Sequence, residues 1–596
     1  MGGCRVVGLL VNAQHFPTSR SSICSSSSSV GLQQGFVQRS NEKQWQQQQL
    51  PTREGCPQKV AARKKSMLTR RKGRILGMGV GEAAAAAAAT TPPHKEGGYE
   101  RFHGKEMHKR RFEYHKGGQT RPARPIPVDN LDVLLFQGFN WESPKRYPWW
   151  TYLQSKVEEL VELGVTDLWL PPASQSVDKN GYLPGQLYNL DASRYGKSME
   201  LRDLIDMLHT HNICAIADIV INHRTAGHQD PRGHWNIFDG GVEDKRLAWG
   251  AWAVVDDDAY DSGGQGHHDS GESYAAAPDL DHTQKQVQDE LTDWMNWLRA
   301  EIGFDGWRFD YAKGYAPEFC GLYCERTNPK FSVGEVWTTM SYQGSRPSAN
   351  QDAHRQRLCD WIDGTGGRVC AFDFTTKGIL QAAVQDELWR LQDSNGKPPG
   401  LIGWWPQRAV TFVDNHDTGS TQRHWSFPDN KVAMGYAYIL THPGIPCIFY
   451  DHYFEWDLKA QIQELVQIRK RNFINAESKI TILLAESDMY VANIADRVIL
   501  KLGPRMDMGR LAPSEQDWKL ASYGDRFAVW ESRRSPPPKI ESHFAEPELE
   551  WPRIEPSHKV HLIDKMTHQT KKRILEEVPN LVDDDEREKF KDELKY

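Results

Sequence analysis

The chain has 596 residues and a formal net charge of −6, and its basic residues show no domain-wide bias of the kind that binds a phosphate backbone. No apolar run approaches the ~20 residues needed to cross a bilayer, and the nine cysteines are odd in number and scattered, unlike a disulfide framework. We therefore expect neither a nucleic-acid partner nor a membrane-spanning protein, and we expect one large domain with appendages.

The first 128 residues differ in composition from those that follow. Residues 1–41 contain no Asp or Glu, carry three arginines and include five consecutive serines at 25–29, which is typical of an organelle transit peptide. Four glutamines at 46–49 and seven alanines at 83–89 offer no packed core. We predict that residues 1–128 are a plastid transit peptide plus a linker, mostly disordered. The alternative is that these residues are a disordered tail without a targeting signal, on a cytoplasmic protein.

From residue 129, short apolar runs alternate with amphipathic helical stretches. Eight runs are predicted to be strands, at 133–141, 165–172, 215–223, 306–312, 331–337, 370–375, 409–417 and 445–452. Helical spacing of apolar residues predicts helices at 156–164, 201–212, 286–303, 379–393 and 434–442. Eight such units in series predict a closed parallel (β/α)8 TIM barrel.

After the eighth strand, the pattern changes. A helix is predicted at 461–472, and four short segments with alternating polarity follow, at 479–485, 488–495, 497–503 and 527–532. Alternation of this kind predicts antiparallel strands.

Polar side chains gather where the predicted barrel strands end, which is the face on which TIM barrels carry their chemistry. They are Asp218, Asn222 and His223 on the third strand, Arg308 and Asp310 on the fourth, Glu335 on the fifth, and His416 and Asp417 on the seventh. Arg308 and Asp310 share one face of their strand, and a structural ion pair is the simplest interpretation of these two alone. Several carboxylates converging on one rim would be costly without a ligand, so the whole set favours catalysis.

Three carboxylates without a nucleotide-binding loop suggest glycosidic chemistry. We expect Asp310 to be the nucleophile, because Arg308 beside it favours the ionised form and lowers its pKa. Glu335, which has apolar neighbours, is expected to keep a proton and to act as acid and then as base. Asp417 would orient the sugar while its ring distorts toward an oxocarbenium ion.

Four motifs resemble, in this order, the signature regions of the α-amylase family of retaining glycoside hydrolases, and its plant members in particular. They are DIVINH (218–223), GWRFDYAKG (306–314), GEVW (334–337) and FVDNHD (412–417). The likeness covers roughly residues 130–532 and implies endohydrolysis of α-1,4-glucosidic bonds in starch and related α-glucans. A related enzyme that transfers glucan chains or cuts branches, and a noncatalytic starch-binding protein, are the alternatives. The noncatalytic starch-binding protein would be expected to lack a catalytic carboxylate.

The resemblance also implies roles for single residues. Asp310 is similar to the family's nucleophile, Glu335 to its proton donor and Asp417 to its transition-state stabiliser. The substrate-binding positions that it implies are Tyr182, His223, Arg308 and His416 at the point of cleavage, together with Lys313 and Trp337.

Trp404 and Trp405 lie between the predicted sixth and seventh strands and are followed by Pro406. Two such indoles could form a rigid exposed platform on which glucose rings stack. The plant α-amylases that this stretch resembles use such a pair to bind raw starch away from the cleft. The alternative is that at least one ring belongs to the core, since Trp is usually well buried.

The resemblance further implies a loop-rich domain inserted after strand 3, at 224–283, within a catalytic barrel at 129–477. The insertion is rich in Gly, Asp and His and poor in apolar runs, so calcium, which prefers oxygen ligands, is the candidate that orders it. The alternative is that its acidic residues only solvate a loop. The primary site implied by the resemblance uses Asn222, Asp269 and Asp279 with the backbone carbonyls of Glu272 and Gly314. Asp239 and Asp244 fit a further site, in which Ala248 stands where the pattern has a carboxylate.

The four alternating segments match the family's small C-terminal antiparallel β-sheet domain, at 478–532. Residues 533–596 form a C-terminal extension that we leave unassigned. We expect the protein to act as a monomer on starch and α-1,4-glucans.

Overall fold

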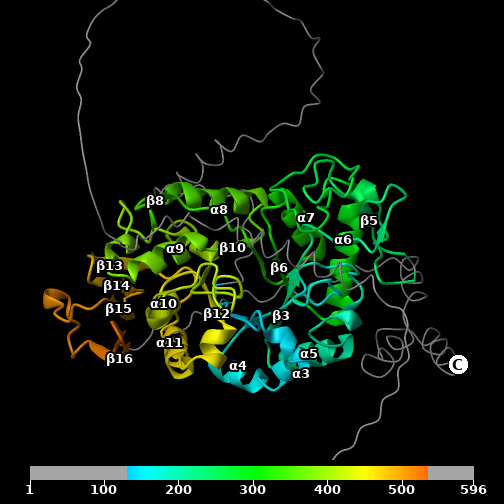
Figure 1. Cartoon of the computed structure of the whole chain (residues 1–596). Coiled ribbons are helices and arrows are strands. Elements are labelled where there is room, and N and C mark those ends of the chain that lie inside the picture. Colours follow the sequence, from blue (N-terminus) through cyan, green and yellow to red (C-terminus); the bar gives the residue numbers. More distant parts are fainter. Residues whose placement is uncertain (1–130, 244, 535–596) are drawn as a thin grey trace, which may run out of the picture. The chain divides into compact units, whose positions relative to one another are not determined.

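The computed structural model describes residues 131–243 and 245–534 (Figure 1). The predicted transit peptide and linker, at 1–128, and almost all of the C-terminal extension lie outside the described residues. Asp244 lies outside them as well. Within the described residues, no helix combines the length and the apolar character needed to cross a membrane.

Eight parallel strands close into a barrel surrounded by helices (Figure 1). The strands are β1 (Leu135–Gln137), β2 (Asp167–Leu170), β3 (Cys214–Ile219), β6 (Gly306–Phe309), β7 (Ser332–Gly334), β10 (Cys370–Phe372), β11 (Ala409–Phe412) and β12 (Ile445–Phe449). They are neighbours in that order, and β12 pairs with β1 to close the ring. Each observed strand lies inside its predicted range, except that β3 begins one residue earlier. The predicted barrel is therefore confirmed.

Nearly every residue of these strands is buried, because side chains fill the interior and helices cover the outside. The covering helices are α3 (Trp149–Gln154), α4 (Val157–Leu163), α5 (Ser198–Thr210), α6 (Lys285–Trp297), α7 (Pro317–Thr327), α8 (Asp352–Gly364), α9 (Phe374–Ala383), α10 (Val432–Thr441) and α11 (Lys459–Arg471). A π-helical turn, Leu298–Ile302, continues α6 and ends at Gly303, which adopts φ 104°.

The single helix predicted at 379–393 is wrong. Helix α9 already begins at Phe374 and stops at Ala383, and a separate 3-10 turn follows at Leu388–Leu391. Between them Asp386 adopts φ 67°, a left-handed conformation that interrupts a helix. Leu388 and Leu391 are nevertheless buried, which explains why the apolar spacing runs on across the break.

The C-terminal sheet has five antiparallel strands in the order β13-β14-β15-β17-β16. They are β13 (Ile480–Ala485), β14 (Tyr490–Ile494), β15 (Val498–Leu502), β16 (Trp518–Gly524) and β17 (Phe527–Ser532). Strand β16 was not predicted from the sequence. It is an edge strand with a bulge between Leu520 and Ser522, which breaks the alternation that identifies a strand.

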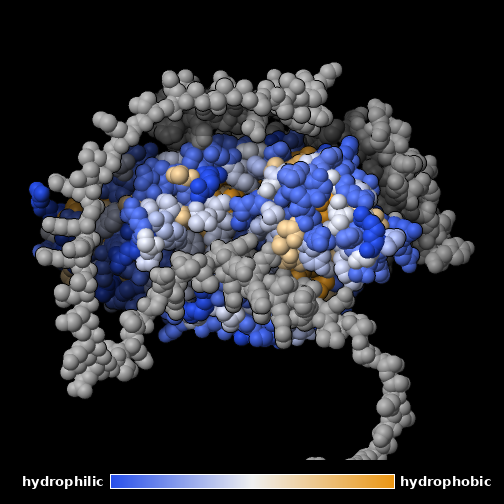
Figure 2. Space-filling view, turned by 45° about the horizontal axis from the view of Figure 1, so that its top comes forward, coloured by the Kyte–Doolittle hydropathy of each residue, from blue (hydrophilic) through white to orange (hydrophobic). Residues whose placement is uncertain are grey.

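The excursion between β3 and α6 is built mainly of loops. The strands among its described residues are β4 (His228–Gln229) and β5 (Trp235–Ile237). Another short hairpin, β8 (Tyr342–Gln343) with β9 (Arg346–Pro347), lies between β7 and α8. The face of the molecule seen in Figure 2 is mostly hydrophilic, with small hydrophobic areas where the grey atoms leave it visible.

Candidate active site

Strand ends place the predicted catalytic residues. Strand β6 ends at Phe309 and Asp310 follows it, while β7 ends at Gly334 and Glu335 follows it. Asp417 lies in the turn after β11, which ends at Phe412. The predicted strands were therefore too long at these ends, because the residues that leave the sheet carry the polar groups.

Arg308 is fully buried inside the barrel and contacts three carboxylates. Its Nη1 lies 2.9 Å from Asp218 Oδ1 and 2.5 Å from Asp310 Oδ1. Its Nη2 lies 3.1 Å from Glu335 Oε2. The guanidinium also lies over the Trp169 ring, with Cζ 4.9 Å from the centroid. The pair Arg308 and Asp310 is therefore part of a larger cluster, and more than an isolated structural ion pair.

Asp218 has a larger part in the site than the sequence analysis assigned to it. Its Oδ2 accepts hydrogen bonds from the Tyr182 hydroxyl, at 2.9 Å, and from Trp169 Nε1, at 3.1 Å. Its Oδ1 binds Arg308. Asp218 thus holds an arginine and a predicted sugar-binding ring in place. The signal that could have identified it is an acidic residue inside a buried apolar run.

Burial controls the ionisation of the four carboxylates. It raises the pKa of Asp218 to about 7, against the opposing effect of Arg308. It also raises the pKa of Asp310 and of Glu335, and it raises the pKa of Asp417 well above the usual range. The expected lowering of the Asp310 pKa is wrong for the free site, because burial outweighs Arg308. One arginine cannot balance four buried carboxylates, so each of them ionises less readily than it would in water.

His416 is buried beside Asp417. Gln137 Nε2 donates to His416 Nδ1 at 2.9 Å, which leaves the proton on Nε2, 3.3 Å from Asp417 Oδ2. Burial holds the His416 pKa well below its usual range, and the charge of Arg308 adds to the effect. A neutral imidazole that can donate from Nε2 therefore lies next to this carboxylate.

Aromatic rings line the site around Tyr182. Its ring is parallel to His416, with centroids 5.2 Å apart, and to Trp141, with centroids 6.2 Å apart. His223 donates to the Tyr182 carbonyl at 2.8 Å and stacks on Tyr274 at 3.8 Å. Trp141 and Tyr274 were not predicted; each is an aromatic residue in a loop, which is a weak signal by itself. Stacked rings of this kind offer apolar faces to sugars.

A second aromatic group follows Glu335. The Trp337 ring stacks on Phe374, with centroids 5.2 Å apart, and is parallel to Trp425, with centroids 6.3 Å apart. We call Trp337 and Trp425 the indole wall. Trp425, which the sequence analysis did not single out, comes from the segment after β11, so the wall joins two distant parts of the chain.

Lys313 lies on the side of the site that faces the loop excursion. Its Nζ is 2.7 Å from Glu272 Oε2 and lies 5.0 Å from the centroid of the Tyr311 ring. Its carbonyl accepts a hydrogen bond from the Glu272 amide at 3.0 Å. These contacts join the excursion to the segment that carries Asp310.

Three predicted calcium ligands each have a buried oxygen that accepts no hydrogen bond. They are Asn222 Oδ1, Asp269 Oδ2 and Asp279 Oδ1. Burial raises the Asp279 pKa well above its usual range, and the charge of Asp269 adds to the effect. A divalent cation would relieve both the missing contacts and the repulsion between the two carboxylates.

The predicted carbonyl ligands approach the same place. A β-carbon on Gly314 would lie 1.9 Å from Asn222 Oδ1, so this backbone passes directly against the amide. A β-carbon on Gly271, beside Glu272, would lie 2.7 Å from the Gly314 carbonyl oxygen. The five residues therefore fit a calcium ion.

The further metal site is a different case. Asp239 is exposed, and its carboxylate accepts hydrogen bonds from Gln186 at 2.9 Å and from the Gly241 amide at 2.8 Å. Its predicted companion, Asp244, lies outside the described residues. The contacts of Asp239 are therefore those of a loop acid that binds one nearby backbone amide and one side-chain amide.

Trp404 and Trp405 are both half-buried and pack against the core. The guanidinium of the buried Arg355 lies 3.8 Å from the centroid of the Trp404 ring. The two rings are therefore less exposed than the predicted platform would require, although neither ring is fully buried.

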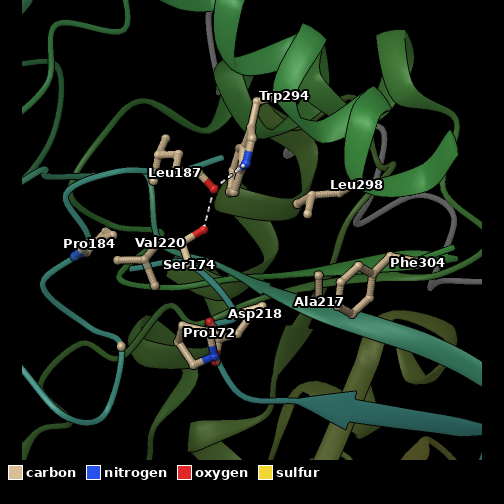
Figure 3. A pocket seen from close by; sticks show the side chains of 12 residues that line it. Pro172, Ser174, Pro184, Leu187, Ala217, Asp218, Val220, Trp294, Leu298 and Phe304 are labelled. Carbon is tan, nitrogen blue, oxygen red and sulfur yellow. Dashed lines mark hydrogen bonds between the residues drawn. The ribbon is translucent and has the colours of Figure 1, made fainter. Parts of the chain in front are cut away.

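A small cavity of about 10 Å³ is lined by Ala217 and Asp218 of β3 and by Trp294 of α6, among others (Figure 3). Ser174 Oγ and Trp294 Nε1 both donate to the Leu187 carbonyl beside it, at 2.7 and 3.0 Å. A space of this size holds no more than a water molecule. It is too small for a sugar ring, so it is not part of the substrate cleft.

Comparison with known proteins gives matches in the barrel and in the C-terminal sheet. The family model described as "Alpha amylase, catalytic domain" matches residues 150–332, and "Alpha-amylase C-terminal beta-sheet domain" matches residues 471–531. "Probable alpha-amylase 2" of Arabidopsis thaliana is 47% identical over 414 residues, covering 69% of this chain and 96% of that protein.

Two further relatives extend the comparison. "Alpha-amylase 3, chloroplastic" of the same plant is 46% identical over 402 residues, covering 67% of this chain but only 44% of that protein. "Alpha-amylase type B isozyme" of Hordeum vulgare is 56% identical over 153 residues, covering 26% of this chain and 99% of that sequence. The chain thus spans less than half the length of the second Arabidopsis relative.

Proposed function

Because this chain belongs to the α-amylase family, we propose that Asp310, Glu335 and Asp417 cleave α-1,4-glucosidic bonds by a retaining double displacement. The enzyme is an α-amylase, and its substrates are starch and related α-glucans. The observation that best supports these roles is that Arg308 contacts both Asp310 and Glu335. One buried cation thereby fixes the positions of the proposed nucleophile and acid relative to each other.

In the first step, an Asp310 oxygen attacks the anomeric carbon while Glu335 gives its proton to the departing glycosidic oxygen. In the second step, Glu335 takes a proton from water, and the water oxygen displaces Asp310 with a second inversion. Asp417, with the neutral His416 beside it, would bind sugar hydroxyls and hold them more tightly as the ring flattens. Tyr182 would supply the stacking surface, and His223 would complete the polar lining.

Amylose tests the reaction directly. The purified enzyme should shorten the chains rapidly and release products that are initially in the α configuration, because two inversions restore the starting geometry. Viscosity and polarimetry measure the two effects. Initial β products would contradict the double displacement, whereas cleavage of only α-1,6 bonds in a branched oligosaccharide would favour the debranching alternative.

Calcium is the metal that we propose for the loop excursion. Asn222, Asp269 and Asp279, with the carbonyls of Glu272 and Gly314, would hold it. The ion would supply charge compensation and fix the excursion against the barrel. The antiparallel bridge between His223 and Asp279 supports this, because it places a proposed ligand opposite a residue of the site.

The platform role of Trp404 and Trp405 can be separated from a core role. If the half-buried rings bind granules, changing both to Ala should reduce adsorption to insoluble starch several-fold while cleavage of a soluble maltooligosaccharide persists. Trp389→Ala is the matched control, since that ring is 40% exposed and lies on another surface turn. A joint fall in thermal stability and in both activities would instead assign the rings to the core.

We also propose plastid import, supported by the composition of residues 1–41 and by the word "chloroplastic" in the name of one relative. A fusion of residues 1–80 to a fluorescent reporter tests it, and a diffuse cytosolic signal would contradict it.

A further inference from the structure

We propose that Lys377 and Asp414 are positioning residues, whose buried ion pair sets the place of the turn carrying Asp417 relative to the indole wall. The inference depends on the role proposed above for Asp417. It concerns residues outside the carboxylate cluster, on α9 and at the end of β11.

Asp414 binds two later points of the chain: Thr418, which closes the turn that contains His416 and Asp417, and Phe427, beyond Trp425. Its Oδ1 accepts from Thr418 Oγ1 at 2.8 Å, and its Oδ2 accepts from the Phe427 amide at 3.1 Å. The Asp414 carboxylate is buried, so these bonds are shielded from water. A shift of this one side chain would therefore disturb both the turn that carries Asp417 and the attachment of the segment that carries Trp425.

The turn itself is held by local hydrogen bonds. Asn415 Oδ1 accepts from the amides of Asp417, at 3.0 Å, and of Thr418, at 2.8 Å. The Trp425 amide donates to the Thr418 carbonyl at 3.3 Å. The turn and the indole wall are consequently linked through the backbone, and Asp414 anchors the unit that they form.

Lys377 connects this unit to α9. It is fully buried, and its Nζ lies 3.4 Å from Asp414 Oδ1. The same Nζ donates to the Trp425 carbonyl and lies 4.6 Å from the centroid of the Trp425 ring. One ammonium group thus touches both the anchor of the turn and the indole wall.

Lys377 is the charged partner of Asp414 within the described residues. His452 Nε2 lies 3.8 Å from Asp414 Oδ2, but burial lowers the His452 pKa to about 3, so this ring is neutral. Burial lowers the pKa of Lys377 only to about 8, and Asp414 opposes that shift, so the lysine remains mostly protonated at neutral pH.

The packing of α9 against Trp425 supports the same inference. A β-carbon on Gly378 would lie 2.7 Å from the Trp425 ring and 2.3 Å from Met340 Sδ, so the indole rests directly on the helix backbone next to Lys377. Apolar residues commonly replace a buried ion pair without loss of stability. The pair at this place is therefore better explained by what it orients than by stability.

Lys377→Met tests the inference, because it keeps an unbranched side chain and removes the charge. We expect kcat on a soluble maltooligosaccharide, per folded molecule, to fall by about 10- to 100-fold with little change in KM, since small displacements of a reacting group carry costs of that order. Lys501→Met is the matched control: Lys501 is also buried, but it donates to the Gly503 carbonyl in the C-terminal sheet. Its kcat per folded molecule should equal that of the wild type.

A double variant separates positioning from stability. Lys377→Met with Asp414→Asn leaves no unpaired buried charge, so thermal stability should recover while kcat stays low. Recovery of kcat together with stability, or a wild-type kcat in Lys377→Met, would overturn the inference. Failure of the proposed function would look different, because Glu335→Gln would then retain activity whatever the Lys377 variants do.

Discussion

Glu335→Gln should lower kcat on soluble starch by roughly 10²- to 10⁴-fold while a maltooligosaccharide still binds with nearly unchanged affinity. Gln has nearly the shape of Glu, and its side-chain oxygen can stay in contact with Arg308, whose Nη2 lies 3.1 Å from Glu335 Oε2. It has no proton to give to the leaving oxygen. Steady-state kinetics and calorimetric titration measure the two effects separately.

Asp310→Asn should cause a loss at least as large, because an amide cannot form the covalent intermediate. Arg308 would retain Asp218 and Glu335 as partners, so the variant should fold, which circular dichroism checks. Glu301→Gln, an exposed acid beyond the C-terminal end of α6, is the control and should have wild-type kinetics. Turnover close to wild type in either Glu335→Gln or Asp310→Asn would refute the assignment of roles.

Removing divalent cations should lower the melting temperature by several degrees and reduce activity in parallel. An ion bound only by the folded state at 100 to 1,000 times its Kd contributes about 3 to 4 kcal/mol, which chelation removes. Asn222, Asp269 and Asp279 would regain buried oxygens without partners, and the excursion would lose one of its attachments to the barrel. Differential scanning fluorimetry with and without a chelator, followed by readdition of calcium, measures the effect.

Asp279→Asn provides the matched comparison. It should have the low melting temperature of the chelated enzyme and should respond little to either chelator or calcium. Asp239→Asn alters an exposed acid and should respond as the wild type does. If dialysis against a strong chelator leaves the melting temperature and activity of the wild type unchanged, the proposed calcium site is wrong.

The barrel and the carboxylates could be predicted because their signals are local. Each barrel strand is a short apolar run, and Asp310 and Glu335 directly follow such runs. The contact between Asp218 and Arg308 is not local, since it depends on the register of β3 against β6, which pairs these two residues. The pKa of Asp310 likewise depends on how completely the folded chain excludes water, which no neighbouring residue reveals.

The errors in secondary structure have the same origin. Apolar spacing continued through Asp386 because the residues on both sides of the break pack on the core, so periodicity alone could not show where α9 ends. Strand β16 escaped notice because a bulge shifts its alternation. Lys377 and Asp414 looked unremarkable because their contact joins α9 to the end of β11 and exists only in the folded protein.

Arg308 has a consequence for the timing of proton transfer. It is close to both Asp310 and Glu335. Burial raises the pKa of Glu335, Arg308 opposes that shift, and the negative charge of an ionised Asp310 adds to it. If Asp310 forms the ester of the proposed covalent intermediate, that charge disappears, and Arg308 then attracts only Asp218 and Glu335 of the carboxylates that it contacts. The acid of the first step would then release its proton more readily, at the moment when a base is needed to activate water. Formation and hydrolysis of the ester would thus adjust the pKa of Glu335 between the two steps, while Arg308 stays the positive charge next to it in both.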